Sequence, residues 1–326
     1  MDYRLLGPVE VVSATGAPLP VAGAKLQGLV VLLALDPRST VSSARLIDAL
    51  YNDPPATVEN AVQQLVSKLR RVLAEGGAPG RVVTRPPGYC LDEPRDAVDA
   101  LRFERLVGDA RAAAGAGDPS RAVLLVEEAL GLWRGEAFAG VTLGGEAAGV
   151  RTRMAELRDA AIDDRVDWEL QRGNHTAVVA ELEAAVAATP LRERRWGQLM
   201  VALYRCGRQS DALRTYRQAR RTLADELGVA PGPELRRLEA AVLSHDPALA
   251  PTNVPTRVLR SGSGACAARG RPASAGTPRS RSSRAWSSGP DWSRWSGQAA
   301  WARPASPSSS QSCWNNACRA ASAGSS

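Results

Sequence analysis

The sequence of 326 residues predicts a mainly α-helical protein in three parts. Residues 1–93 combine short β-rich stretches, three helical segments and a β-hairpin. Residues 97–245 are rich in Ala and Leu, carry mixed charges and contain no β-rich run, which is typical of an all-helical domain. From residue 260 onward the chain has no Val, Ile, Leu, Met, Phe or Tyr. Residues 251–326 are therefore expected to form a disordered tail, because they cannot build a core.

The net charge of +7 does not by itself indicate a nucleic-acid-binding protein. Residues 251–326 hold 10 Arg and one acid, which gives the tail a charge of +9 and leaves −2 for the first 250 residues. The sequence contains no 18-residue apolar run and does not begin with a signal peptide, so we expect a cytoplasmic protein without a membrane span. The five scattered Cys have no nearby His, and we expect neither a metal site nor a cofactor.

The first helical segment follows two extended stretches. Residues 3–12 and 18–21 are β-rich and predict a small sheet. Apolar residues then recur at helical spacing from Lys25 to the Asp36-Pro37 pair, which ends the helix. Gly28 lies inside this helix at a cost of about 1 kcal/mol relative to Ala.

The next segments predict a helix-turn-helix followed by a hairpin. Ser42 or Ser43 can cap a short helix over residues 44–50, and residues 53–55 break the chain before a longer helix from Thr57 to about residue 73. The longer helix has one apolar face and one polar face. Residues 81–91 then form strand, Pro-Pro-Gly turn and strand, with Arg81 and Arg85 near or at the tip. A hairpin in this position is a wing.

The polar face of the longer helix is the candidate binding site. Asn or Gln can bond bidentately to adenine in the major groove of DNA, and Arg or Lys can contact guanine or phosphate. The wing would reach a phosphate or the minor groove. The alternative is an ordinary solvated helix surface, which the neighbouring helix and the basic hairpin argue against. The predicted DNA-binding residues are Asn60, Gln63, Gln64, Ser67, Lys68 and Arg71 on the helix and Arg81, Thr84 and Arg85 on the wing.

The helical domain contains a 34-residue repeat, the period of tetratricopeptide repeats. Gly173 and the small or apolar residues after it recur around Gly207, and an earlier copy around Gly117 is out of phase, so insertions are expected between Gly131 and Arg151. We expect Trp133, Trp168, Trp196 and Tyr216 to lie in the core.

The helical domain shows no catalytic constellation. Its two His are far apart, and acids such as Asp163 and Asp164 are interpreted as solvated helix surface. The chain is therefore not expected to be an enzyme.

The tail contains five of the eight Trp of the chain, which is unusual for a linker. Trp has a single codon, and reading the segment DWSRWSGQAAWARPAS one base earlier, with free codon choices, gives LVTLVGPGGVGKTRL. This product contains the GxxxxGKT pattern of a phosphate-binding loop. The sequence therefore suggests the hypothesis that the tail is the frame-shifted start of an ATPase domain.

Several motifs together resemble the SARP family of bacterial antibiotic-pathway activators. They are YRLLGPVEV, LIDALYNDPPATVENAVQQLVSKLRRVL, TRPPGYCLD, LRFERLV, LWRGEAF and LYRCGRQSDALRTYRQARRTLADELGVAPGPELRRLEAAVL, spread over residues 1–250. The resemblance implies an OmpR-type winged helix followed by a bacterial transcriptional activation domain. It also implies a homodimer that binds direct repeats in double-stranded promoter DNA, contacts RNA polymerase and controls a secondary-metabolite gene cluster. Large members of the family continue into an ATPase after a Pro-Thr-Asn linker like residues 251–253.

Two other functions remain open from the sequence. The chain could be a helical-repeat interaction scaffold that does not bind DNA, or a truncated ATP-dependent regulatory switch. The scaffold predicts no binding to any promoter fragment. The switch requires a phosphate-binding loop that this translation does not contain.

Overall fold

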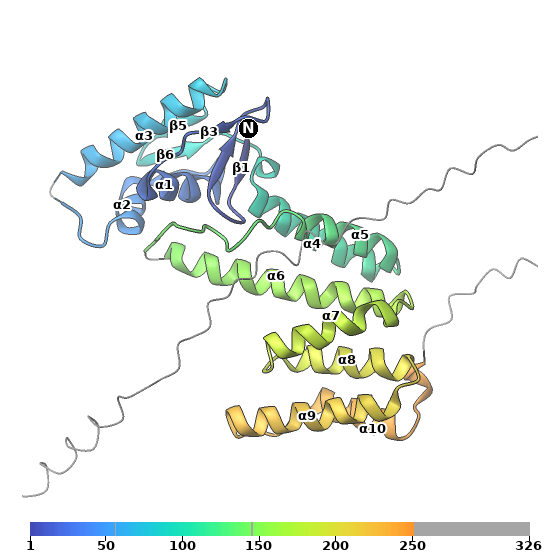
Figure 1. The fold of residues 1–326 in the computed structure, drawn as a ribbon. Helices are drawn as coiled ribbons and strands as arrows, with labels where there is room; N and C mark the ends of the chain where they lie inside the picture. The colour runs from blue at the N-terminus through green and yellow to red at the C-terminus, as the bar shows by residue number, and fades with distance from the viewer. Residues whose placement is uncertain (56, 145, 251–326) are drawn as a thin grey trace, which may run out of the picture. The chain divides into compact units, whose positions relative to one another are not determined.

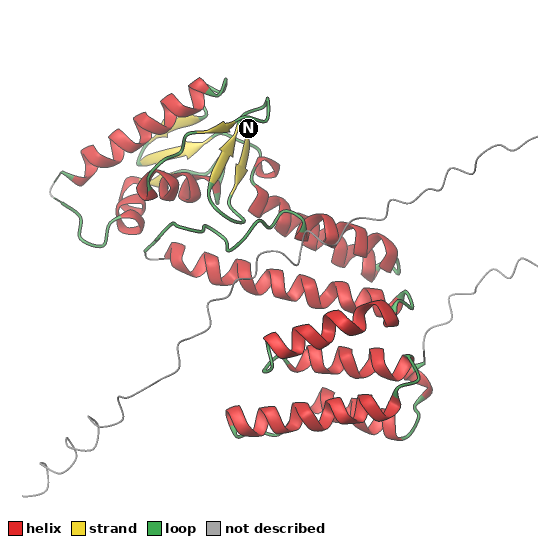
Figure 2. Ribbon diagram, in the orientation of Figure 1, coloured by secondary structure: helices red, strands yellow, loops and turns green. Residues whose placement is uncertain are grey.

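The computed structural model describes residues 1–55, 57–144 and 146–250, and it has the expected mainly helical architecture (Figures 1 and 2). The predicted disordered tail and its possible frame change lie outside these residues. In the described part of the chain, no helix is both long and apolar enough to cross a membrane.

The N-terminal part contains two small antiparallel sheets of three strands each. The first has the order β1-β2-β3, and the second has the order β4-β6-β5. The strands are β1 (Asp2–Arg4), β2 (Glu10–Val12), β3 (Pro18–Leu19), β4 (Val41–Ser42), β5 (Val82–Arg85) and β6 (Gly88–Leu91). The predicted hairpin is confirmed as β5 and β6. The two-residue strand β4, which pairs with β6, was not predicted.

The three predicted helices are α1 (Ala24–Ala34), α2 (Ser43–Leu50) and α3 (Val58–Glu75), which pack against one another and against the sheet of β4, β5 and β6. The Ser42 hydroxyl caps α2 by accepting a hydrogen bond from the Arg45 N–H at 3.2 Å. Gly28 is buried in α1, and a Cβ atom at this position would lie 2.6 Å from Leu50 Cδ2 and 3.3 Å from Leu143 Cδ2. The close approach of these side chains therefore explains a glycine that is unfavourable for the helix itself.

The rest of the described chain is helical, as predicted. It contains α4 (Asp99–Gly115), α5 (Pro119–Leu130), α6 (Glu146–Gln171), α7 (His175–Ala188), α8 (Glu193–Arg205), α9 (Gln209–Leu227) and α10 (Pro233–Leu243), with short 3-10 turns at Arg95–Ala97 and Pro247–Leu249. The insertion expected after Gly131 is the irregular segment between α5 and α6.

The three glycines of the repeat have the same structural role. Gly117, Gly173 and Gly207 have φ values of 84°, 86° and 77°. In each turn the N–H of the following residue bonds to a carbonyl five residues earlier, as in the Asn174 N–H to Glu169 oxygen bond of 3.0 Å. This is the Schellman arrangement that ends a helix. It requires one residue in the left-handed backbone conformation, which glycine adopts at no steric cost. The sequence repeat is therefore a repeat of helix pairs.

The apolar side chains form two hydrophobic cores. The first extends from Tyr3 to Trp168 and includes side chains of both sheets and of α1 to α6, and the second extends from Val166 to Leu249. Helix α6 contributes to both cores. The expected aromatic core residues are buried: Trp133, Trp168, Trp196 and Tyr216 are at most 7% exposed.

Polar contacts also join the β1–β2 connection to the helical part. The carboxylate of Asp99 is 2% exposed and accepts the Leu5 N–H at 2.6 Å and the Leu6 N–H at 3.1 Å. Burial raises the pKa of Asp99, and the two amide hydrogen bonds oppose that rise. The Arg134 N–H donates to the Leu6 carbonyl at 2.7 Å. The segments on both sides of the expected boundary at residues 93–97 thus contribute side chains to one shared core. The division into two domains stays a prediction.

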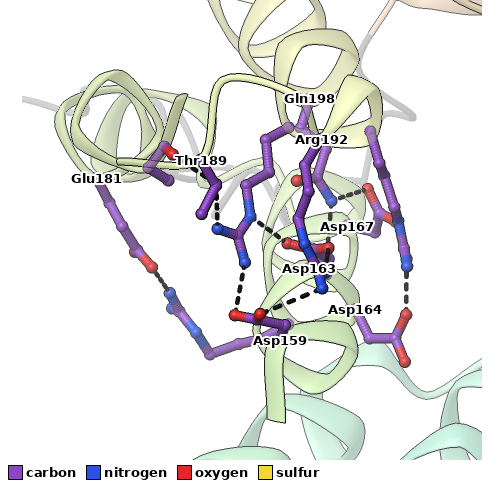
Figure 3. A network of polar contacts seen from close by, with 12 residues as sticks. Asp159, Asp163, Asp164, Asp167, Glu181, Thr189, Arg192 and Gln198 are labelled. Carbon is purple, nitrogen blue, oxygen red and sulfur yellow. Dashed lines mark hydrogen bonds and ion pairs between the residues drawn. The ribbon is translucent and has the colours of Figure 1, made fainter. Parts of the chain in front are cut away.

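A network of ion pairs fixes α6 against α8, and here the interpretation of Asp163 as solvated surface was wrong. Asp163 is 4% exposed, and its carboxylate accepts the Arg195 Nε–H at 2.7 Å. Asp164 accepts from Arg194 at 2.6 Å and from Arg111 of α4 at 2.8 Å. Figure 3 shows Asp159, Asp163, Asp164 and Asp167 of α6 in this network of polar contacts. The acids face basic side chains of neighbouring helices, so they stabilise the packing of the helical part.

Candidate nucleic-acid interface

Helix α3 has one buried face and one exposed polar face. Its buried side chains are Val62, Val66, Leu69, Val72 and Leu73. The six helix residues that the sequence singled out line a single shallow groove of about 510 Å³ on the other face, and all six are exposed: Asn60, Gln63, Gln64, Ser67, Lys68 and Arg71. Three amide side chains and two cations are thus presented together on one helix surface.

The positive charges of α3 and the wing tip are available to bind a polyanion. Residues 57–89 contain five basic side chains and two acidic ones, Glu59 and Glu75. In the part of the chain that the structure describes, no carboxylate lies within ion-pair distance of Lys68, Arg71 or Arg85. The Lys68 ammonium has one weak contact, 3.5 Å from the Ala22 carbonyl oxygen. These cations can therefore neutralise phosphates without first breaking an ion pair.

The wing is attached to α3 by a side chain that the sequence analysis did not select. Arg70 donates from Nε to the Val82 carbonyl at 2.9 Å and from Nη2 to the Thr84 hydroxyl at 2.8 Å. Thr84 is exposed, but its hydroxyl oxygen accepts this bond. Arg70 is thus a positioning residue that fixes β5 relative to the helix. In the sequence it is one cation among five, with no feature that separates it from the others.

Arg85 is the last residue of β5, next to the Pro86-Pro87 turn, and its side chain is exposed. This agrees with the predicted position at the tip of the wing.

The predicted position of Arg81 near the tip was wrong. Val82 pairs with Leu91 and Arg85 pairs with Gly88, so Arg81 lies at the opposite end of the hairpin. Its Nε lies 3.4 Å from a carboxylate oxygen of Glu93, which is 3% exposed, and its Nη1 donates to the Asp92 carbonyl at 3.3 Å. Arg81 therefore closes the base of the hairpin. The prediction used only the number of residues between Arg81 and the turn, which does not give the strand register.

Gly88 lies where strand β6 of the wing pairs with β4, the third strand of the same sheet. A Cβ atom at this position would lie 1.9 Å from the Val41 carbonyl oxygen and 2.7 Å from the Ser42 Cα. Only a glycine allows β6 to approach β4 this closely. The Pro-Pro-Gly sequence indicated a turn, but the contact with β4 could not be read from it.

These features define a class of protein: a winged-helix DNA-binding regulator whose DNA-binding part is joined to a domain of repeated helix pairs. Comparison with known families agrees. Residues 22–91 match the model of the transcriptional regulatory protein C-terminal domain, and residues 98–243 match the bacterial transcriptional activator domain.

Individual proteins similar to this chain are bacterial regulatory proteins. The chain is 41% identical to the transcriptional regulator RedD of Streptomyces coelicolor over 265 residues, which cover 80% of the chain and 74% of RedD. It is 33% identical to the regulatory protein DnrI of Streptomyces peucetius, covering 76% of the chain and 94% of DnrI. It is 40% identical to the regulatory protein AfsR of Streptomyces coelicolor, covering 78% of the chain but 25% of AfsR.

A solved structure shows the same fold. It is the structure of Mycobacterium tuberculosis EmbR in complex with low affinity phosphopeptide, and the similarity has a TM-score of 0.72 at 34% identity over 76% of the chain and 65% of that structure's chain. The chain therefore belongs to the SARP family of bacterial antibiotic-pathway regulators, which are DNA-binding transcriptional activators.

Proposed function

We propose that this protein is the pathway-specific activator of a bacterial secondary-metabolite gene cluster. In this proposal a homodimer binds direct repeats in promoter DNA and recruits RNA polymerase, in the cytoplasm at the nucleoid. The observation that carries the proposal is the single groove on α3 that all six predicted helix residues line. Helix α3 would enter the major groove, which admits one helix.

Within this proposal the contacts divide into two kinds. Asn60, Gln63 and Gln64 present amides for base edges, whereas Lys68, Arg71 and Arg85 present cations for phosphates or guanine. Ser67 completes the helix surface. Thr84 takes part through its bond with Arg70, and Arg81 is assigned to the base of the wing instead of the DNA surface.

The operator can be sought with the full chain on DNA from around its own gene. We expect a gel shift that survives random competitor DNA, and footprint protection of two direct repeats one helical turn apart. Absence of specific binding to every neighbouring promoter would favour the scaffold without DNA binding.

Replacing Gln64 by Ala should weaken binding to the operator by about 1–3 kcal/mol and leave binding to random DNA unchanged, because a base contact is lost. Titration of labelled operator and random duplexes by fluorescence anisotropy measures both affinities. Gln218→Ala is the matched control, since Gln218 is an exposed glutamine of α9 outside the interface. Equal losses on both duplexes would remove Gln64 from the base readers.

Replacing Arg85 by Ala should weaken binding to operator and random DNA alike. The slope of log K against log salt should become shallower by about 0.9 for the one phosphate no longer neutralised. The measurement is the affinity at a series of salt concentrations, with Arg217→Ala on the exposed surface of α9 as control. An unchanged slope would show that the wing tip does not contact a phosphate.

A further inference from the structure

A second groove lies in the helical part, far in sequence from the DNA-binding surface. It has a volume of about 720 Å³ and is lined by residues of α6, α8 and α10. Helix α8 contacts both of the other helices and forms the middle of the groove. Its apolar surface comes from Leu170, Val201, Leu235 and Leu238. This volume lies within the range of about 300–1,000 Å³ that is typical of small-molecule sites.

Arg205 brings an uncompensated positive charge to this groove. Its Nε donates to the Leu249 carbonyl at 3.0 Å, and its Nη1 donates to the Leu170 carbonyl at 2.7 Å. Among the described residues, no carboxylate lies within ion-pair distance of it. Burial lowers the pKa of Arg205, in contrast to Arg194 and Arg195, whose pKa values are raised by the aspartates beside them. Two neutral carbonyl groups do not replace an anionic partner.

Gln198 adds a buried acceptor to the lining. The residue is 4% exposed, and its Nε2 donates to the Asp163 carbonyl at 2.7 Å and to Asp167 Oδ1 at 2.8 Å. Its Oε1 has no hydrogen-bond partner among the described residues. A buried acceptor without a donor is unfavourable, so a donor that reached Gln198 Oε1 would be favourable.

Two of the three acidic residues of the groove are paired with arginines, and the third, Glu193, accepts a backbone N–H. Asp167 pairs with Arg194 at 2.6 Å, Glu193 accepts the Gly232 N–H at 2.7 Å, and Glu234 pairs with Arg237. Among the described residues, the charged groups of the groove that have no charged partner are therefore Arg205 and Glu193, beside the acceptor of Gln198 and an apolar surface.

We propose that this groove binds a small carboxylic acid with an apolar body. Its carboxylate would pair with Arg205, and a hydroxyl or N–H group on its body would donate to Gln198. This inference adds a ligand site to the proposed function and does not depend on DNA binding.

The test uses the full chain and two probes of the same shape, 6-hydroxy-2-naphthoic acid and its neutral amide, in calorimetric titrations. We expect saturable binding of one acid per chain and at least tenfold weaker binding of the amide. Arg205→Gln should bring the two affinities to within about twofold, because the paired charge supplies the preference. Arg217→Gln, on the exposed surface of α9, should retain the wild-type preference.

A second variant tests the groove without altering its charges. Val201→Phe should fill the apolar surface and weaken both probes at least tenfold, and it decides the matter if Arg205→Gln does not fold. The proposal is overturned if the wild-type protein does not bind the acid up to millimolar concentration or binds both probes equally. It is also overturned if folded Arg205→Gln keeps the preference, or if Val201→Phe binds as the wild type does.

Discussion

Asp163→Ala should lower the free energy of unfolding by about 3–5 kcal/mol, which is the usual cost of leaving one partner of a buried ion pair behind. Arg195 is 5% exposed, and Asp163 accepts its Nε–H directly. Arg195 retains a bond to Asp159 at 3.1 Å, but that carboxylate is more exposed and does not replace the lost contact. The measurement is urea unfolding of the full chain followed by circular dichroism.

The control for this variant removes the more exposed carboxylate of an ion pair that joins α6 to α7. Arg165 of α6 pairs with Glu181 of α7, whose side chain is 44% exposed. Glu181→Ala should change stability by less than about 1 kcal/mol. The apolar double variant Asp163→Leu with Arg195→Met should recover most of the loss, since it leaves no buried charge. A similar loss for Asp163→Ala and Glu181→Ala would show that the pair is solvated.

Gly88→Ala should be the most damaging change in the wing. The new Cβ would lie 1.9 Å from the Val41 carbonyl oxygen, and both partners of this overlap are backbone atoms, which cannot rotate away. We expect the pairing of β4 with β6 to be lost, a stability loss of about 3 kcal/mol, and operator binding at least tenfold weaker. Thermal unfolding and operator titration measure the two effects.

Gly108→Ala separates steric overlap from any general effect of replacing glycine. Gly108 is exposed in α4, and a Cβ atom there meets nothing within 4 Å. This variant should be stabilised by about 0.5–1 kcal/mol, because alanine favours the helix. Wild-type stability and operator affinity in Gly88→Ala would show that β6 can move away from β4 at little cost.

Helix α3 could be predicted in detail because its two faces differ in residue type at helical spacing. Apolar and amide residues separate on α3, and the structure confirms that the six selected side chains line one groove. Their contact with DNA stays a prediction. The repeat could be predicted because Gly173 and Gly207 occupy the same turn of successive helix pairs.

Other features could not be read from the sequence because they depend on partners that are distant in the chain. Asp163 is the same residue type whether it is solvated or paired, and its partner Arg195 is 32 residues away. Strand β4 has only two residues and exists because β6 pairs with it. Arg81 was placed by its distance from the turn, whereas strand register decides on which end of the hairpin it lies.

The shared first core has a consequence for the design of hybrid regulators. Exchanging operator specificity between relatives by joining chains at residues 93–97 would cut through packed side chains and separate Asp99 from the amides of Leu5 and Leu6. A junction in the turn at Gly173 would keep α4, α5 and α6 with the winged helix and leave that core whole. The unit that can be transplanted is therefore larger than the DNA-binding domain, and the helices joined to it must preserve the contacts of α6 with the second core, such as that of Asp163 with Arg195.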